Sequence, residues 1–381
     1  MSEKRTRRSG SVFAWLRIAF AVCVSGALVT FSDGSIAADS EAKAEPLEIV
    51  FFFLGPARDG GWNSIFDDAR RQLDESFGDQ VTTSFRENVV EGPPTLRIVE
   101  AAIQDGANVV VSTQFGFGES MMEVAAKYPE VFFIVSQWDN PGTLDNFVGF
   151  VNAPEDAAYL AGIAAGYILE SGGTVGWVDG FPIPYDIRTI NGFALGLARS
   201  NPTATAQVVF TNDWGDINRQ ALATRSLIAS GAGFISTSLN GRVVGEIAES
   251  SGVPFAVPAT YGSRFAPNWM VTRFVYTWAP VIERVLHSIF QSTFDTAFIY
   301  SGLADGGVSI GPWGAPYDPL SEDAKADIAR EIERLRNGGA VFRGPLTDKD
   351  GNVVARDGDT LSIDERRSMK FVLPNVAGVE F

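Results

Sequence analysis

The sequence predicts an α/β protein of two doubly wound parallel-sheet lobes joined by a hinge of several chain crossings. Three observations predict this fold class. From residue 47 onward, strand-like apolar runs alternate with amphipathic helical segments, which is the pattern of a parallel sheet with helical crossovers. The series is interrupted near residue 150 and then starts again. At 381 residues, 45% of them hydrophobic, the chain can fill the cores of two lobes.

The first lobe begins with the apolar run IVFFFL at 49–54, which is typical of a strand buried on both faces. The next segment, 64–77, carries its apolar residues on one helical stripe, formed by Ile65, Phe66, Ala69, Leu73 and Phe77. The remaining elements of this series are expected as strand 81–87, helix 95–104, strand 108–113, helix 119–128 and strand 131–137.

The segments 146–151 and 155–170 form a strand and a helix at the junction between the two series. The second series is expected as strand 174–179, helix 186–200, strand 206–211, helix 218–230, strand 233–238, helix 243–250 and strand 253–259. The strand and helix in 270–290 are predicted to cross back to the first lobe. Residues 298–310 and the charged helix 321–336 then return to the second, and Asp350-Gly351 is expected at the turn of a β-hairpin.

These crossings predict lobe 1 at 47–150 plus about 262–296, and lobe 2 at 151–261 plus about 297–381. A hinge between two α/β sheets implies a ligand cleft.

Residues 1–37 have the three regions of a secretory signal peptide. A basic start is followed by the apolar run 12–31 and by the small residues Ser35-Ile36-Ala37, which offer a cleavage site. A membrane anchor and a lipoprotein are the alternatives, but Arg17 interrupts the apolar run and Phe20-Ala21-Val22 is a poor lipobox before Cys23. We therefore expect a periplasmic protein in which 38–46 is a linker.

Loss of the leader removes five basic and two acidic residues, which changes the formal net charge from −16 to −19. Such a charge repels nucleic acid and anionic membranes, so neither is an expected partner. The single cysteine, Cys23, leaves with the leader, and the fold has no disulfide to rely on. We expect a monomer.

In open α/β sheets, ligands bind beyond the carboxyl ends of the strands. The turns at these ends combine Trp, Phe or Tyr with Asn, Gln or Asp and with glycines. They are 55–63, 113–118, 137–140, 177–185, 212–216, 238–242 and 259–264. Aromatic faces beside amide groups suit a flat, hydrogen-bonding and mostly uncharged ligand. Core packing is the alternative for any single aromatic residue among them.

Other site chemistries find little support. No Lys follows a Gly, so there is no P-loop, and Gly55, Gly60 and Gly61 do not fit the dinucleotide-binding spacing. The only histidine, His287, is expected on a helix face, which leaves hydrolase triads and histidine-rich metal sites without members. The 348–353 segment imitates a calcium loop but has Val353 where the loop requires Gly. No cofactor or metal is expected.

Six stretches together resemble the basic membrane protein family, the substrate-binding proteins of ABC importers that include the purine nucleoside receptors. They are GPARDGGWN, NFVGFVNAPEDAAYLAGIAAG, WVDGFPIP, TNDWGD, YTWAPVIERVL and ADGGVSIGPWG. The resemblance runs from about Ile49 to the C-terminus and is greater to the branch that bears GGW. It implies a type I periplasmic-binding fold, a purine base or nucleoside as ligand and an ABC permease as partner. Members tend to have an acidic partner for ribose hydroxyls where this chain has 259–262.

The predicted ligand-binding residues come from both lobes. Trp62 is expected as a stacking plate, Asn63 as an amide clamp and Asp213 either as a ligand contact or as a helix cap. The full set is Asp59, Trp62, Asn63, Thr113, Gln114 and Trp138 in the first lobe, and Trp177, Asp213, Trp214 and Asn240 in the second. A periplasmic carboxylate-dependent hydrolase and a ligand-sensing domain of a membrane receptor are the alternative functions.

Overall fold

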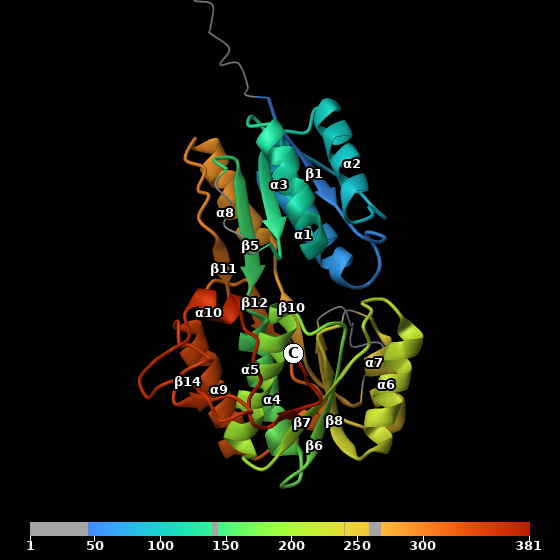
Figure 1. The fold of residues 1–381 in the computed structure, drawn as a ribbon, viewed down its shortest axis with the longest axis vertical. Helices are drawn as coiled ribbons and strands as arrows, with labels where there is room; N and C mark the ends of the chain where they lie inside the picture. The colour runs from blue at the N-terminus through green and yellow to red at the C-terminus, as the bar shows by residue number, and fades with distance from the viewer. Residues whose placement is uncertain (1–44, 139–143, 240, 259–267) are drawn as a thin grey trace, which may run out of the picture. The chain divides into compact units, whose positions relative to one another are not determined.

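A computed structural model describes residues 45–138, 144–239, 241–258 and 268–381 (Figure 1). The predicted signal peptide and nearly all of the predicted linker lie outside the described residues. From Glu45 onward the chain forms one compact unit with two large sheets. In the described ranges, no helix is both long and apolar enough to span a bilayer.

The first sheet has six strands in the order β11-β5-β4-β3-β1-β2, and all its pairings are parallel. Its strands are β1 (Leu47–Phe52), β2 (Val81–Arg86), β3 (Val109–Ser112), β4 (Phe132–Ser136), β5 (Phe147–Asn152) and β11 (Ile299–Ser301). Its helices are α1 (Trp62–Phe77), α2 (Pro93–Gln104), α3 (Gly118–Lys127) and α8 (Ala279–Phe290), with the short turns η1 (Gly78–Gln80) and η2 (Phe115–Phe117).

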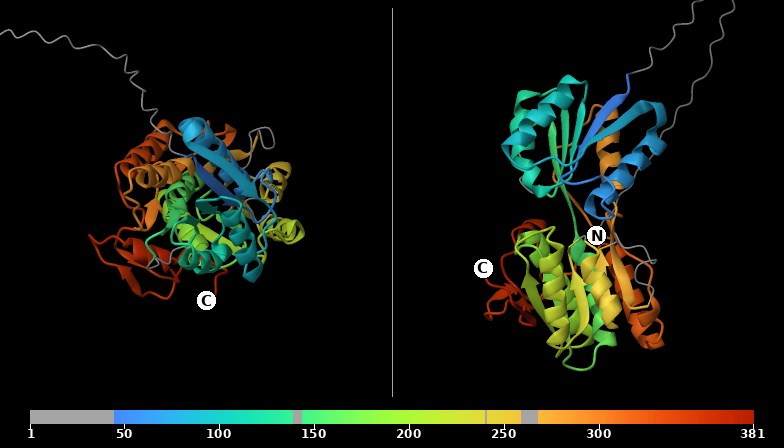
Figure 2. Two further views of the ribbon diagram at one scale, coloured as in Figure 1. Left: turned by 90° about the horizontal axis from the view of Figure 1, so that it is seen from above. Right: turned by 90° about the vertical axis from the view of Figure 1, so that its right-hand side faces the viewer.

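Alternate residues of each strand supply two separate cores, because successive side chains point to opposite faces of a sheet. In β1, Phe51 packs with α1 and α8 on one face, whereas Phe52 packs with α2 and α3 on the other. Both faces are therefore covered by helices, and the near-continuous apolar run of β1 follows from this double burial. Figure 2 shows helices on both sides of the strands.

The second sheet has seven strands in the order β12-β10-β9-β8-β6-β7-β15, parallel except for β12 against β10. Its strands are β6 (Thr174–Asp179), β7 (Thr205–Phe210), β8 (Ala232–Thr237), β9 (Phe255–Pro258), β10 (Met270–Tyr276), β12 (Val308–Ile310) and β15 (Val376–Ala377). Its helices are α4 (Pro154–Ile168), α5 (Pro184–Ser200), α6 (Ile217–Ala229), α7 (Val243–Ser251), α9 (Glu322–Arg336), α10 (Ile363–Arg367) and the turn η3 (Ala315–Tyr317). The α/β fold class and its two parallel sheets are as predicted.

The chain passes between the two sheets three times: after β5, between β10 and β11, and between β11 and β12. Two strands differ from the predicted lobe boundaries. The strand 270–276 was expected with the first lobe but pairs with β9 in the second sheet, and 299–301 was expected with the second lobe but pairs with β5 in the first. Both crossings therefore occur one strand later than predicted. A short strand carries no sequence signal for which of two sheet edges it will join.

The predicted hairpin is present as β13 (Leu346–Thr347) and β14 (Val353–Ala355), which pair antiparallel around Asp350-Gly351. Gly351 has φ +85°, a conformation that glycine adopts without strain. The Asp348 carboxylate accepts the N–H groups of Asp350 and Asn352, so the acidic residues of this loop stabilise the turn itself.

Candidate functional site

The GGW turn that follows β1 is organised around one carboxylate. Asp59 accepts the backbone N–H groups of Gly61, Asn63 and Ser64 at 2.6, 3.3 and 3.1 Å, and thereby satisfies the free N–H groups at the start of α1. Asp59 was predicted to contact the ligand. In the structure its carboxylate accepts these three N–H groups, and this cap fixes the two residues that follow Gly61.

Asn63 is the residue of this turn that keeps free bonding capacity. Its side chain is buried, and its Nδ2 donates to Asp59 at 2.9 Å. Its Oδ1 has no hydrogen-bond partner among the described residues. A buried amide oxygen without a partner costs about 1–3 kcal/mol, so this atom is suited to accept a donor from a bound molecule.

Trp62 is partly exposed and is held at both ends. Its Nε1–H donates to the Thr113 carbonyl at 2.7 Å, and its ring lies edge-on to Trp278 at 5.2 Å and to Tyr276 at 6.1 Å. Trp62 begins α1 of the first sheet, whereas Tyr276 ends β10 of the second. The aromatic group therefore joins the carboxyl edges of both sheets.

The other predicted residues of the first sheet lie at the ends of β3 and β4. Thr113 is buried and donates its hydroxyl to the Phe52 carbonyl, so it fixes the strand end. Gln114 is partly exposed after it. Trp138 is also partly exposed, donates Nε1–H to the Met122 sulfur, and packs over Gly118, where a Cβ would collide with the ring.

Trp177 was predicted to face the ligand, but it lies in the core of the second sheet. It is 0% exposed, and its ring packs against Phe193 and Phe274. Its position inside β6, two residues before the strand end, turns the side chain into the helix layer. Its Nε1–H donates to the carboxylate of Asp179 at 2.8 Å, and so Trp177 helps to fix a residue at the carboxyl edge of the second sheet.

Trp214 lies in the turn after β7, and its side chain is half-exposed. Its ring is 46% exposed and lies 5.0 Å from that of Phe181, directly over Gly180. Asp213 accepts N–H groups from Gly215 and from the residue after it, so its carboxylate stabilises the turn before α6 and does not cap the helix itself. The N-cap of α6 is the next acidic residue, Asp216, whose carboxylate accepts from two N–H groups of the first turn.

Sequence reasoning missed a group of buried polar side chains at the carboxyl edge of the second sheet: Asp179, Asp186, Ser238 and Tyr276. Asp179 ends β6, Ser238 follows β8, Tyr276 ends β10 and Asp186 lies in the first turn of α5. Three of their atoms have no hydrogen-bond partner in the described ranges: Asp186 Oδ2, Ser238 Oγ and Tyr276 OH. Asp179 and Ser238 lie in the predicted turns 177–185 and 238–242 but were not chosen as ligand contacts, whereas Asp186 and Tyr276 lie outside the predicted turns.

The two carboxyls of this group are buried, and the charge of Asp179 disfavours ionisation of Asp186. Burial raises the pKa of Asp179 to about 6, while hydrogen bonds from Trp177 and the Gly180 amide oppose the change. Burial also raises the pKa of Asp186 well above its ordinary value; the Asp179 charge adds to this, and Arg188 offsets part of it. The carboxyl edge of the second sheet therefore holds two carboxyl groups, Asp179 and Asp186, whose protonated form is favoured by burial.

A second polar network lies where the chain leaves β5. The Glu155 carboxylate is fully buried, faces the Arg188 guanidinium at 3.4 Å and accepts a short hydrogen bond from the Tyr300 hydroxyl. Asn152 accepts from Tyr185 at 3.0 Å, which ties the end of β5 to α5. This network connects elements of both sheets at the crossings.

Some of the predicted site residues lie in parts of the chain that the structure does not describe. Asn240, the turn 259–264 and residues 139–140 lie outside the described residues. Within the described ranges, no group of His, Cys, Asp and Glu has the arrangement of a metal site.

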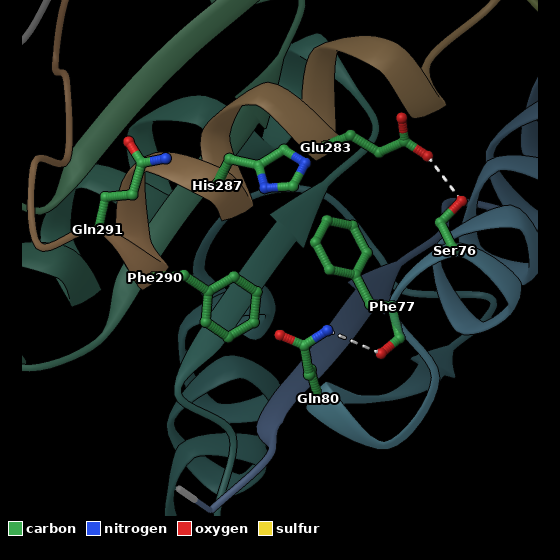
Figure 3. A pocket seen from close by; sticks show the side chains of 7 residues that line it. All are labelled: Ser76, Phe77, Gln80, Glu283, His287, Phe290 and Gln291. Carbon is green, nitrogen blue, oxygen red and sulfur yellow. Dashed lines mark hydrogen bonds between the residues drawn. The ribbon is translucent and has the colours of Figure 1, made fainter.

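A surface pocket of about 220 Å³ lies elsewhere, between α1 and α8 (Figure 3). It is lined by Ser76, Phe77, Gln80, Glu283, His287, Phe290 and Gln291. The His287 ring packs 5.1 Å from Phe77, as expected for a helix-face histidine. The pocket is formed at the C-terminal end of α1, away from the turns that follow the strands.

Two parallel sheets that carry polar and aromatic turns at their carboxyl edges, with three chain passages between them, define a type I periplasmic-binding-protein-like fold. Solved structures share this fold: the chain is similar to a solute-binding protein of an ABC transporter system from Conexibacter woesei (TM-score 0.63, 24% identity, 77% of this chain and 97% of that one). A solute-binding protein from Aeropyrum pernix is also similar in fold (TM-score 0.64, 16% identity, 77% of this chain and 92% of that one).

The chain belongs to the family of PnrA-like ABC transporter substrate-binding proteins, whose model matches residues 47–339. The predicted resemblance is thus confirmed. Among curated relatives, it is 28% identical to a purine-binding protein of Brucella abortus over 88% of this chain and 93% of that protein. It is 27% identical to a putative ABC transporter glucose-binding protein of Haloferax volcanii over 80% and 77%. Membership implies a small-molecule ligand and a permease partner.

Proposed function

We propose that this protein captures a planar heterocycle of the purine class between the carboxyl edges of its two sheets and delivers it to an ABC permease. The observation that carries the proposal is the contact between Trp62 and Tyr276, which brings the edge bearing Asn63 beside the edge bearing Asp186. A flat ring placed here meets aromatic surface and buried hydrogen-bonding atoms together. That combination is what an uncharged heterocycle requires.

The role of each residue follows from its contacts. Trp214 and Trp62 supply aromatic surface, and Asn63 Oδ1 accepts a hydrogen bond from the ligand. Asp59 and Asp213 hold the backbone of their turns. Gln114 and Trp138 extend the wall on the first sheet. None of these roles requires bond cleavage, and we propose that the ligand leaves unchanged.

The 28%-identical purine-binding relative supports the purine class, and the 27%-identical putative glucose-binding relative offers the competing ligand. A sugar offers hydroxyls around the whole ring and would use the buried polar atoms. It would leave the exposed Trp214 face less well matched than a flat heterocycle would. We further propose that the protein acts in the periplasm as a monomer after removal of the leader 1–37.

Native mass spectrometry of freshly purified protein tests this proposal, because a tightly held ligand survives purification and reveals its mass. We expect a single added mass in the range of a purine base or nucleoside, lost on unfolding. A hexose mass, or a chemically converted product after incubation with a purine nucleoside, would contradict the proposed function.

A further inference from the structure

The carboxyl edge of the second sheet contains a buried carboxylate that interacts with Arg188 and Ser238 but keeps one oxygen without a hydrogen bond. Asp186 is 2% exposed, and its Oδ2 has no hydrogen-bond partner among the described residues. An unpaired buried carboxyl is costly to keep, and a natural sequence retains such a cost mainly at a functional site. Its missing partner must be a hydrogen-bond donor.

Two buried hydroxyl groups, those of Ser238 and Tyr276, lie at the same edge of the sheet as Asp186. Neither Ser238 Oγ nor Tyr276 OH forms a well-aligned hydrogen bond with a described residue. Burial raises the pKa of the Asp186 carboxyl, and Ser238 lies close enough to oppose this change, whereas burial together with the charge of Asp186 raises the pKa of Tyr276. Asp179, the other carboxyl at this edge, is already paired with the Trp177 indole and the Gly180 amide. Asp186 is therefore the acceptor with free capacity, next to hydroxyls that can donate.

We propose that Asp186 is a specificity-determining residue that accepts an N–H from an exocyclic amino group of the ligand, while Ser238 or Tyr276 donates to the adjacent ring nitrogen. This inference rests on the proposed function and names the ligand more closely. An amino group beside an unprotonated ring nitrogen is the pattern of adenine. Hypoxanthine presents the reverse pattern, an oxygen acceptor beside a ring N–H, and would place its oxygen against the Asp186 oxygen.

The test is calorimetric titration of the full chain with adenine and with hypoxanthine. We expect the wild-type protein to bind adenine at least tenfold more tightly. Asp186→Asn keeps the size of the side chain but adds a donor, and we expect adenine affinity to fall about tenfold to a hundredfold, as for a buried donor that loses its acceptor. The preference for adenine over hypoxanthine should shrink by at least tenfold, since the new amide can donate to the hypoxanthine oxygen.

Asp67→Asn is the matched control. Asp67 is also 2% exposed, but it lies on α1 and is fully engaged by Arg70 and Arg71. We expect this variant to melt at a lower temperature and to keep the adenine preference. Asp186→Asn should melt no lower than the wild type, because it removes an unpaired buried carboxyl. Ser238→Ala and Tyr276→Phe each remove only a hydroxyl, and we expect at least one of them to weaken adenine binding without loss of folding. Unchanged adenine affinity in both variants would contradict the proposed donor to the ring nitrogen.

The outcomes separate the inference from the proposed function. If the wild-type protein binds both purines equally, or if Asp186→Asn keeps the wild-type preference, the inference is wrong while purine binding stands. A lowered melting temperature of Asp186→Asn with an unchanged preference would assign Asp186 to the fold. If the protein binds glucose and neither purine, the proposed function fails, and the inference fails with it.

Discussion

Replacement of Trp214 by Ala removes an aromatic face that is half-exposed in the ligand-free protein. The ring is 46% exposed and packs on Phe181 at 5.0 Å. A ligand that covers one side of it buries on the order of 50 Å² of this ring, worth about 1.3 kcal/mol. Stacking adds about 0.5–1.5 kcal/mol. The sum of about 2–3 kcal/mol predicts roughly 30- to 150-fold weaker purine binding.

The folded state should lose much less than the complex does. Truncation of Trp214 forfeits the ring pair with Phe181, about 0.5–1.5 kcal/mol, and leaves no sealed cavity. Trp177→Ala is the contrasting variant, because Trp177 is fully buried and donates to Asp179. We expect it to lose about 3–5 kcal/mol of folding stability.

Calorimetric titration with adenine, together with ligand-free denaturant unfolding, measures both quantities for each variant. We expect Trp214→Ala to show the large affinity loss and the small stability loss, and Trp177→Ala to show the large stability loss. Unchanged adenine affinity in Trp214→Ala would refute its role as a stacking surface. The exposed ring would then be a surface residue that only covers Gly180.

Three further predictions concern the turns, the pH dependence and the leader. Gly180→Ala places a methyl group against the Trp214 ring, so we expect weaker purine binding with little change in melting temperature; unaltered affinity would mean that the ring position is unimportant. Because burial raises the pKa of Asp179 to about 6 and that of Asp186 well above its ordinary value, the folded state keeps protons that the unfolded state has released. The free energy of unfolding should therefore fall as pH rises from about 4 to 6. The expected slope is about 1.4 kcal/mol per pH unit for one proton. Asp186→Asn should flatten this part of the unfolding free energy, and a slope equal to that of the wild type would contradict it. N-terminal sequencing of the secreted protein should begin just after Ala37, and a start at Met1 or a lipid on Cys23 would show that the leader is no cleaved signal peptide.

The fold followed from features that are local in sequence. Phe51 and Phe52 point to opposite faces, yet both are apolar, and such a run identifies a strand covered by helices on both sides. The repeat of such runs with amphipathic helices predicted both sheets. The membership of β10 and β11 was not predictable, because it depends on which sheet edge is free in three dimensions.

The sequence indicates which turns follow the strands, but it does not show which way the side chains of those turns point. Sequence shows that Asp59 and Trp177 lie near strand ends, but not that Asp59 accepts helix N–H groups or that Trp177 turns into the core. The register of a strand decides such questions. Asp186 and Ser238 were not chosen from the sequence because what distinguishes them is a buried oxygen without a hydrogen-bond partner. Such an atom can be recognised only when the positions of all its neighbours are known.

The central claim is that this substrate-binding protein takes a purine. Titration of the full chain with adenine, its nucleoside and glucose in one calorimetric series tests it most directly. We expect one site per chain, with binding of at least one purine and no measurable heat from glucose. Saturable binding of glucose without any heat from the purines would show that the ligand is not a purine.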